Sequence, residues 1–228
     1  GNKSGNNNNN NKSPPKAPSS IAFQYPEPEM CKSKMKSIMK EYFVGGDTAD
    51  AVLSVDELVG YKADSSEKDK GDAVQRGAAI VDAGVMLVLE GKESEVKSFL
   101  TVSEECLKQG KLPVESLALG LSEPLEFLRD IEIDAPLASK FLSQIIAAWM
   151  VPAAGDGGAA LSFSLFLQAP DYFKSDGRPA ELLKQILVIY SQKDGCSITD
   201  EHVDVVSKLM TDEEAKNYGD VRKWLEQP

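Results

Sequence analysis

The chain has 228 residues, of which 42% are hydrophobic and 27% charged, and its formal net charge is −11. This length and composition are sufficient for one well-packed core or for a helical array. So acidic a surface argues against direct binding to nucleic acid, whose phosphates it would repel, and favours a basic protein partner.

A polar leader that includes the asparagine run Asn6 to Asn11 opens the chain. Such a segment buries too little apolar surface to offset its conformational entropy. We therefore expect a disordered Asn/Ser/Pro-rich linker over residues 1–28 and a folded domain over residues 29–228. The leader has a charge of +2, so the folded part carries −13. Because the chain begins with Gly rather than Met, we expect it to be a fragment of a longer protein.

Three widely spaced cysteines and a single histidine, His202, limit the chemistry of the chain. An odd count of scattered cysteines is typical of reduced thiols in a cytosolic or nuclear protein. Since the sequence shows neither a signal-peptide core nor an apolar run of transmembrane length, we expect an intracellular, cytoplasmic protein. No zinc site can be assembled at the usual ligand spacings, and no nucleophile motif or phosphate loop is present. We interpret His202 as a surface histidine on an acidic helix. The sequence predicts no enzymatic activity, no cofactor and no metal, with an enzyme that uses His202 or a cysteine as a distant alternative.

Apolar residues recur at spacings of three and four from Glu29 to the end of the chain, which is typical of amphipathic helices. No stretch alternates with period two, so strands are not expected. Glycines, prolines and capping residues separate the helical segments. The sequence predicts an all-α fold of about nine or ten helices, arranged as stacked antiparallel hairpins in a HEAT-like superhelix.

Cap and breaker residues set the expected boundaries of the helices. Asp47 and either Ser197 or Thr199 are N-cap residues, and Thr211 with Glu214 forms a capping box. In chain order, the expected helices run from Glu29 to Gly45, from Asp47 to Val59, from about Asp72 to Glu90, from about Ser94 to Lys108, from Pro113 to Leu128, from Asp134 to Trp149, from Leu161 to Leu167, from Pro179 to Gln192, from Thr199 to Leu209 and from Thr211 to Leu225.

Residues 117–136 predict a corner between two antiparallel helices. The first helix has an apolar face formed by Leu117, Leu121, Leu125 and Leu128. Asp134 occupies the position of an N-cap for the next helix, and Pro136 falls in its first turn, where a missing N–H costs nothing. Two apolar helices joined by so short a connection pack antiparallel and leave the corner in solvent.

This corner holds three carboxylates within five residues, namely Asp130, Glu132 and Asp134. They fit two interpretations, a capped helix end with solvated charges or a rigid acidic knuckle presented to a basic partner. The two do not exclude each other, because a capped corner is also held firmly in place.

Several short motifs resemble, in their order and spacing, the MA-three domain, which is a stack of atypical helical-repeat hairpins. The motifs are Lys40 to Phe43, Gly46 to Thr48, Ala51-Val52, Glu57-Leu58, Leu87 to Lys92, Asp130 to Pro136, Leu165-Phe166 and Leu182 to Leu187. The resemblance covers residues 30–190 and extends more loosely over residues 197–226. The chain is most similar to the MA-three domain of the translation initiation scaffold family, factor four-G. It also resembles the related domains of the programmed-cell-death-four inhibitors.

The resemblance implies a scaffold domain that binds the DEAD-box RNA helicase of translation initiation, factor four-A. In this family, acidic residues at helix corners meet basic patches on the RecA-like lobes of the helicase. Carried over by position, Asp130 and Asp134 fall on the acidic loop that the family uses, and we add Glu132 on charge alone. Asp47, with Glu41 nearby, matches the first acidic corner.

The resemblance also implies that this domain has no catalysis of its own and that the rest of a longer chain contacts other initiation factors. We expect a monomer without direct contacts to nucleic acid or membrane. Two alternatives stay open. The same surface could block the helicase, as in a translational inhibitor, or the chain could be a structural helical-repeat adaptor for another basic partner.

Overall fold

A computed structural model describes residues 1, 24–152, 160–176 and 178–227 of this chain. These residues form thirteen α-helices and one 3-10 helix, and they contain no strand. The expected all-α helical-repeat class is therefore confirmed. Of the leader predicted to be disordered over residues 1–28, residues 2–23 lie outside the described residues. The described part ends at Pro28, which already belongs to the first helix, and the ring of Tyr25 contacts the guanidinium of Arg76.

The first two hairpins follow the sequence pattern closely. Their helices are α1 (Pro28–Gly45), α2 (Thr48–Val59), α3 (Glu67–Leu89) and α4 (Glu93–Lys108). Helix α3 begins five residues earlier than predicted, because the side chain of Ser66 accepts a hydrogen bond from the backbone N–H of Asp69 at 3.2 Å and caps it.

The third hairpin differs from the prediction in its first arm. Instead of one helix, three short helices lead up to α8, and their bounds are α5 (Glu115–Gly120), α6 (Ser122–Glu126), α7 (Leu128–Asp134) and α8 (Ala138–Trp149). Pro124 explains the first break, because it has no N–H to donate to the carbonyl of Gly120, where α5 ends. This division also raises the number of helices above the nine or ten expected.

The predicted N-cap role of Asp134 is wrong. Asp134 is the last residue of α7, and Leu137 stands at the N-cap of α8 without a side-chain cap. Pro136 lies in the turn between the two helices, not in the first turn of α8 as predicted. A proline disfavours helical geometry at the residue before it, and Ala135 accordingly leaves the helix with φ −126° and ψ 80°. Pro136 therefore stops α7 instead of starting α8.

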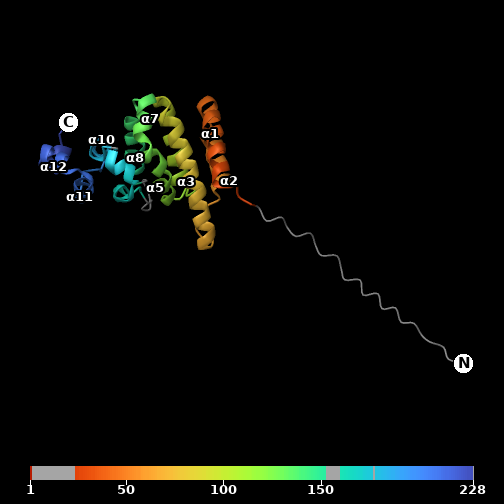
Figure 1. Cartoon of the computed structure of the whole chain (residues 1–228). Coiled ribbons are helices and arrows are strands. Elements are labelled where there is room, and N and C mark those ends of the chain that lie inside the picture. The colour runs from red at the N-terminus through yellow and green to blue at the C-terminus, as the bar shows by residue number, and fades with distance from the viewer. Residues whose placement is uncertain (2–23, 153–159, 177, 228) are drawn as a thin grey trace.

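The first arms of successive hairpins run in the same direction. Arg76 of α3 lies 4.5 Å above the ring of Tyr25, just before α1, and Asp82 lies 2.5 Å from Lys32, inside α1. Helices α1 and α3 therefore run parallel to each other. The turns that follow α1, α3 and α7 consequently lie at one edge of the array, where Figure 1 shows the ends of α3 and α7 next to the end of α1.

The second arms are also parallel to one another and pack through a buried aromatic contact. Phe99 of α4 meets Trp149 of α8 edge-on with ring centroids 5.9 Å apart. The indole N–H of Trp149 donates to the hydroxyl of Ser103 at 3.1 Å. Gly84 makes room for this pair, because a Cβ there would lie 2.3 Å from the Phe99 ring. Side-chain packing between successive hairpins thus forms one continuous hydrophobic core along the array.

The C-terminal part adds shorter elements to the stack. Pro179 opens its longest helix, as predicted. The elements are η1 (Phe163–Gln168), α9 (Asp171–Asp176), α10 (Pro179–Ser191), α11 (Asp200–Leu209), α12 (Asp212–Tyr218) and α13 (Val221–Leu225).

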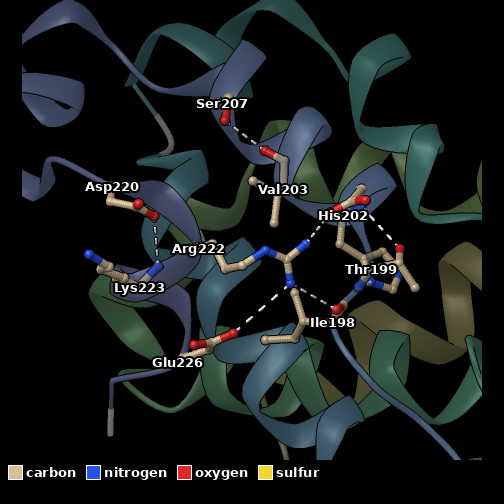
Figure 2. A network of polar contacts seen from close by, with 10 residues as sticks. Ile198, Thr199, His202, Val203, Ser207, Asp220, Arg222, Lys223 and Glu226 are labelled. Atoms are coloured by element: carbon tan, nitrogen blue, oxygen red, sulfur yellow. Dashed lines mark hydrogen bonds and ion pairs between the residues drawn. The ribbon is translucent and has the colours of Figure 1, made fainter.

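Arg222 ties the last helices together, as Figure 2 shows. Its guanidinium donates to the carbonyl of Ile198 at 3.3 Å, pairs with Asp200, and lies 4.0 Å from Glu226. The N-caps predicted at Thr199 and Thr211 are both confirmed. These polar contacts thus hold α13 against the start of α11 at the C-terminal end of the array.

Candidate functional site

Three turns bring most of the candidate residues to the same edge of the array. These turns join α1 to α2, α3 to α4 and α7 to α8. We call this region the acidic edge and define it by its carboxylates, which are Glu41, Asp47, Asp50, Glu90, Glu93, Asp130, Glu132 and Asp134.

The first turn holds the predicted pair Glu41 and Asp47. Asp47 caps α2 as expected, because its carboxylate accepts the backbone N–H of Asp50 at 3.1 Å. Glu41, Asp47 and Asp50 line a shallow hollow of about 230 Å³, together with the ring of Tyr42. The turn also leaves Val44 91% exposed. Sequence and structure agree on this corner, where a capped helix end presents clustered negative charge.

The middle turn is partly neutralised. Glu93 pairs with Lys97 at 3.4 Å and with Lys140 of α8 at 3.3 Å. The hydrogen bond and the positive charge of Lys140 lower the pKa of Glu93, which keeps this carboxylate ionised. The contact between Glu93 and Lys140 links the middle turn to the third one, so the edge is continuous across the two hairpins.

The third turn separates its carboxylates into two kinds. Glu132 is half-buried, lies 2.7 Å from the guanidinium of Arg129, and accepts a hydrogen bond from the hydroxyl of Ser139. Asp130 and Asp134 are exposed, and their side chains have neither a hydrogen-bond nor an ion-pair partner within the described ranges. Glu132 thus fastens α7 to α8, while Asp130 and Asp134 project unneutralised charge from a fixed turn.

His202 is not a surface residue as predicted, because it is only 8% exposed. Its ring meets Phe163 and Tyr190 edge-on at 5.0 and 5.5 Å, and its Nδ1 accepts the backbone N–H of Thr199 at 3.1 Å. Burial lowers the pKa of His202, against a smaller opposing effect of Glu201. The spacing Thr199-x-x-His202, which is that of a capping box, was the available signal for this role.

All three cysteines are free thiols, and those of Cys31 and Cys106 are buried. Burial raises the pKa of Cys106 to about 12, so its thiol stays protonated. Among the residues described, no group of three His, Cys, Asp or Glu side chains could hold a metal ion. In the same residues, no helix has both the length and the apolar character needed to cross a membrane.

Sequence reasoning missed the apolar side chains that the third turn exposes. Ile133 is 76% exposed and Leu137 is 55% exposed, on either side of Asp134. Their signal was present in the spacing, because Ile133 lies between two carboxylates and off the buried face marked by Leu128 and Ile131.

Comparison with known proteins identifies no relative. No protein-family model matches the chain, and neither a curated protein nor a solved structure matches it.

Proposed function

We propose that this chain is a protein-binding scaffold domain of the MA-three type, which docks the DEAD-box RNA helicase of translation initiation, factor four-A, on its acidic edge. Asp130 and Asp134 make the main polar contacts, and Asp47 with Glu41 contributes from the first turn. Glu132 acts indirectly by holding the third turn in place. The proposal assigns no catalytic step and no cofactor to this chain.

The observation that carries the proposal is the pair of unpartnered carboxylates on a braced turn. An acidic side chain that already forms an internal ion pair has little charge left for a partner, and Asp130 and Asp134 form none within the described residues. The bracing of the turn by Glu132 and Ser139 reduces the ordering cost of binding. Both properties suit contacts with a basic surface.

Electrostatics adds a general preference for such a partner. Exposed ion pairs contribute only about 0–1 kcal/mol each, so several of them are needed for a stable complex. An edge formed by three turns supplies several carboxylates at once. Because these charges are exposed, the affinity should fall as salt rises and shortens the screening length.

The experiment that tests the proposal is titration calorimetry of the chain against the factor four-A helicase at low and moderate salt. The test variant is Asp130→Lys with Asp134→Lys. A matched control is Asp72→Lys with Glu115→Lys. It reverses two exposed carboxylates in the N-terminal parts of α3 and α5, away from the acidic edge. Circular dichroism verifies that both variants are folded.

We expect wild type and the control to bind, and the Asp130/Asp134 variant to lose binding. Equal loss in both variants would indicate attraction by net charge alone, without a docking site. Absence of binding by wild type would reject the helicase as the partner and leave the structural-adaptor alternative. The effect of a binding chain on the ATPase or unwinding rate of the helicase then separates a supporting scaffold from an inhibitor.

A further inference from the structure

The outward side of α7 combines acidic and apolar side chains. Phe127 at the N-cap of this helix and Asp130, Ile133 and Asp134 within it are exposed, whereas Leu128 and Ile131 are buried. Leu137 follows in the turn to α8. Apolar and acidic groups therefore alternate along one short exposed surface.

The apolar groups on this surface are unusually accessible. Ile133 is 76% exposed, Leu137 is 55% exposed and Phe127 is 42% exposed. Isolated exposed apolar residues are normal in proteins. Here three of them occur within the stretch from residue 127 to residue 137, beside two carboxylates that have no partner in the described chain. Such a combination is typical of a protein-interaction surface.

The backbone that carries these side chains is held in place from within. Glu132 binds Arg129 of its own helix and Ser139 of α8, on either side of the turn. Lys140 further attaches the start of α8 to Glu93 of α4. Ile133 and Leu137 therefore project from a turn whose position does not depend on a partner.

We infer that Ile133 and Leu137, with the exposed part of Phe127, are the apolar anchors of the docking surface, and that the partner covers them with an apolar recess inside a basic surface. This inference rests on the proposed function and specifies which contacts supply the affinity. Charge complementarity determines the kind of partner, because Asp130 and Asp134 flank Ile133 and require cationic groups around the recess.

The carboxylates and the apolar anchors have different roles in binding. Exposed ion pairs guide encounter and orientation, while a few side chains packed into desolvated pockets near the centre of an interface account for most of the binding energy. Covering Ile133 and Leu137 would also remove water from the neighbouring carboxylates and strengthen their attraction to cations.

The test measures the dissociation constant for the factor four-A helicase over a series of salt concentrations. The variant Ile133→Ser with Leu137→Ser removes the anchors and keeps every charge. Leu53→Ser is the matched control, because Leu53 is 56% exposed on α2. Asp130→Asn with Asp134→Asn removes the charges and keeps the anchors.

We expect the Ile133/Leu137 variant to bind about tenfold more weakly at every salt concentration with an unchanged salt dependence. The Asp130/Asp134 variant should instead bind more weakly at low salt with a reduced salt dependence, and Leu53→Ser should bind like wild type. If the Ile133/Leu137 variant binds like wild type while the charge variant does not, the anchor inference is wrong and the proposed function stands. If wild type fails to bind the helicase, both are wrong.

Discussion

Lys32 of α1 places its ammonium 2.5 Å from the Asp82 carboxylate of α3, which is 6% exposed. The same ammonium lies 2.8 Å from Glu123 of α6, so one cation joins the first arms of three hairpins. The second oxygen of Asp82, Oδ1, is buried without a hydrogen-bond partner in the described structure. Among the described residues, Lys32 is therefore the cation that compensates the buried charge of Asp82.

Lys32→Met should lower the free energy of unfolding at pH 7 by about 2 kcal/mol, because it leaves a buried carboxylate unpaired; the figure is reduced for the partial exposure of Lys32. Burial already raises the pKa of Asp82. In the variant, the folded state therefore binds a proton before the unfolded state does, and stability recovers as pH falls from 7 towards 4. Urea denaturation at several pH values measures this trend.

A double variant provides the control for this ion pair. Lys32→Met with Asp82→Asn removes the unpaired charge and should regain part of the lost stability without the pH trend. A pH-independent loss in Lys32→Met alone would show that Asp82 is not the group responsible.

Gly120 allows α5 to approach α3 closely. A Cβ at this position would lie 2.6 Å from the carbonyl oxygen of Ala78 and 2.5 Å from the Cβ of Val81. Since the carbonyl belongs to the backbone, it cannot move without displacing the helix. Gly120→Ala should thus destabilise the protein by about 2–3 kcal/mol, as measured by thermal or urea unfolding.

Gly71 is the matched control for this substitution. It lies inside α3 and a Cβ there would meet nothing within 4 Å. Gly71→Ala should stabilise the protein by about 0.5–1 kcal/mol through helix propensity and the entropy of the unfolded chain. Equal effects at the two glycines would contradict the close approach of α3 and α5.

The helices and most of their caps could be predicted from sequence because these features depend on local chemistry. Asp47 and Thr199 cap the helices assigned to them, and Pro179 begins α10 as expected. Periodicity of three and four was sufficient to identify the all-α class. Helix caps, helix starts and fold class could be predicted because each depends on residues close together in the sequence.

The helix boundaries around the third turn were predicted wrongly, because two prolines interrupt helices that the apolar periodicity predicts to be continuous. The leucine spacing predicted one helix, but Pro124 interrupts the hydrogen-bond ladder within it. The position of Pro136 after Asp134 predicts a helix start, but its effect on Ala135 ends α7 instead. The burial of His202 was also beyond prediction, since it depends on rings from η1 and α10 that are distant in sequence.

Glu132 holds the third turn through two contacts, an ion pair with Arg129 and a hydrogen bond from Ser139, and substitutions can separate them. Glu132→Gln loses the ion pair with Arg129 but can still accept a hydrogen bond from Ser139. Glu132→Ala loses both. We expect losses in the free energy of unfolding of about 0.5 kcal/mol for Gln and about 1–2 kcal/mol for Ala, measured by urea denaturation. Equal, negligible losses would show that Glu132 is an ordinary surface charge.

His202 should make the stability of the protein depend on pH between 7.5 and 5. Its pKa is lowered by burial, while an unfolded histidine titrates near 6.5. Below pH 6.5 the unfolded state therefore binds more protons than the folded state, and the stability contributed by neutral His202 is lost as pH falls through the folded pKa. Protonation would also place an N–H where Nδ1 accepts the backbone N–H of Thr199.

His202→Gln isolates this effect, because glutamine is a usual partner in a capping box and does not titrate. The melting temperature of wild type should fall more steeply than that of the variant between pH 7.5 and 5, and NMR titration of the ring should give a pKa below 6.5. Parallel pH profiles for the two proteins would mean that the ring titrates alike in both states. In that case His202 would support the helix cap without sensing pH.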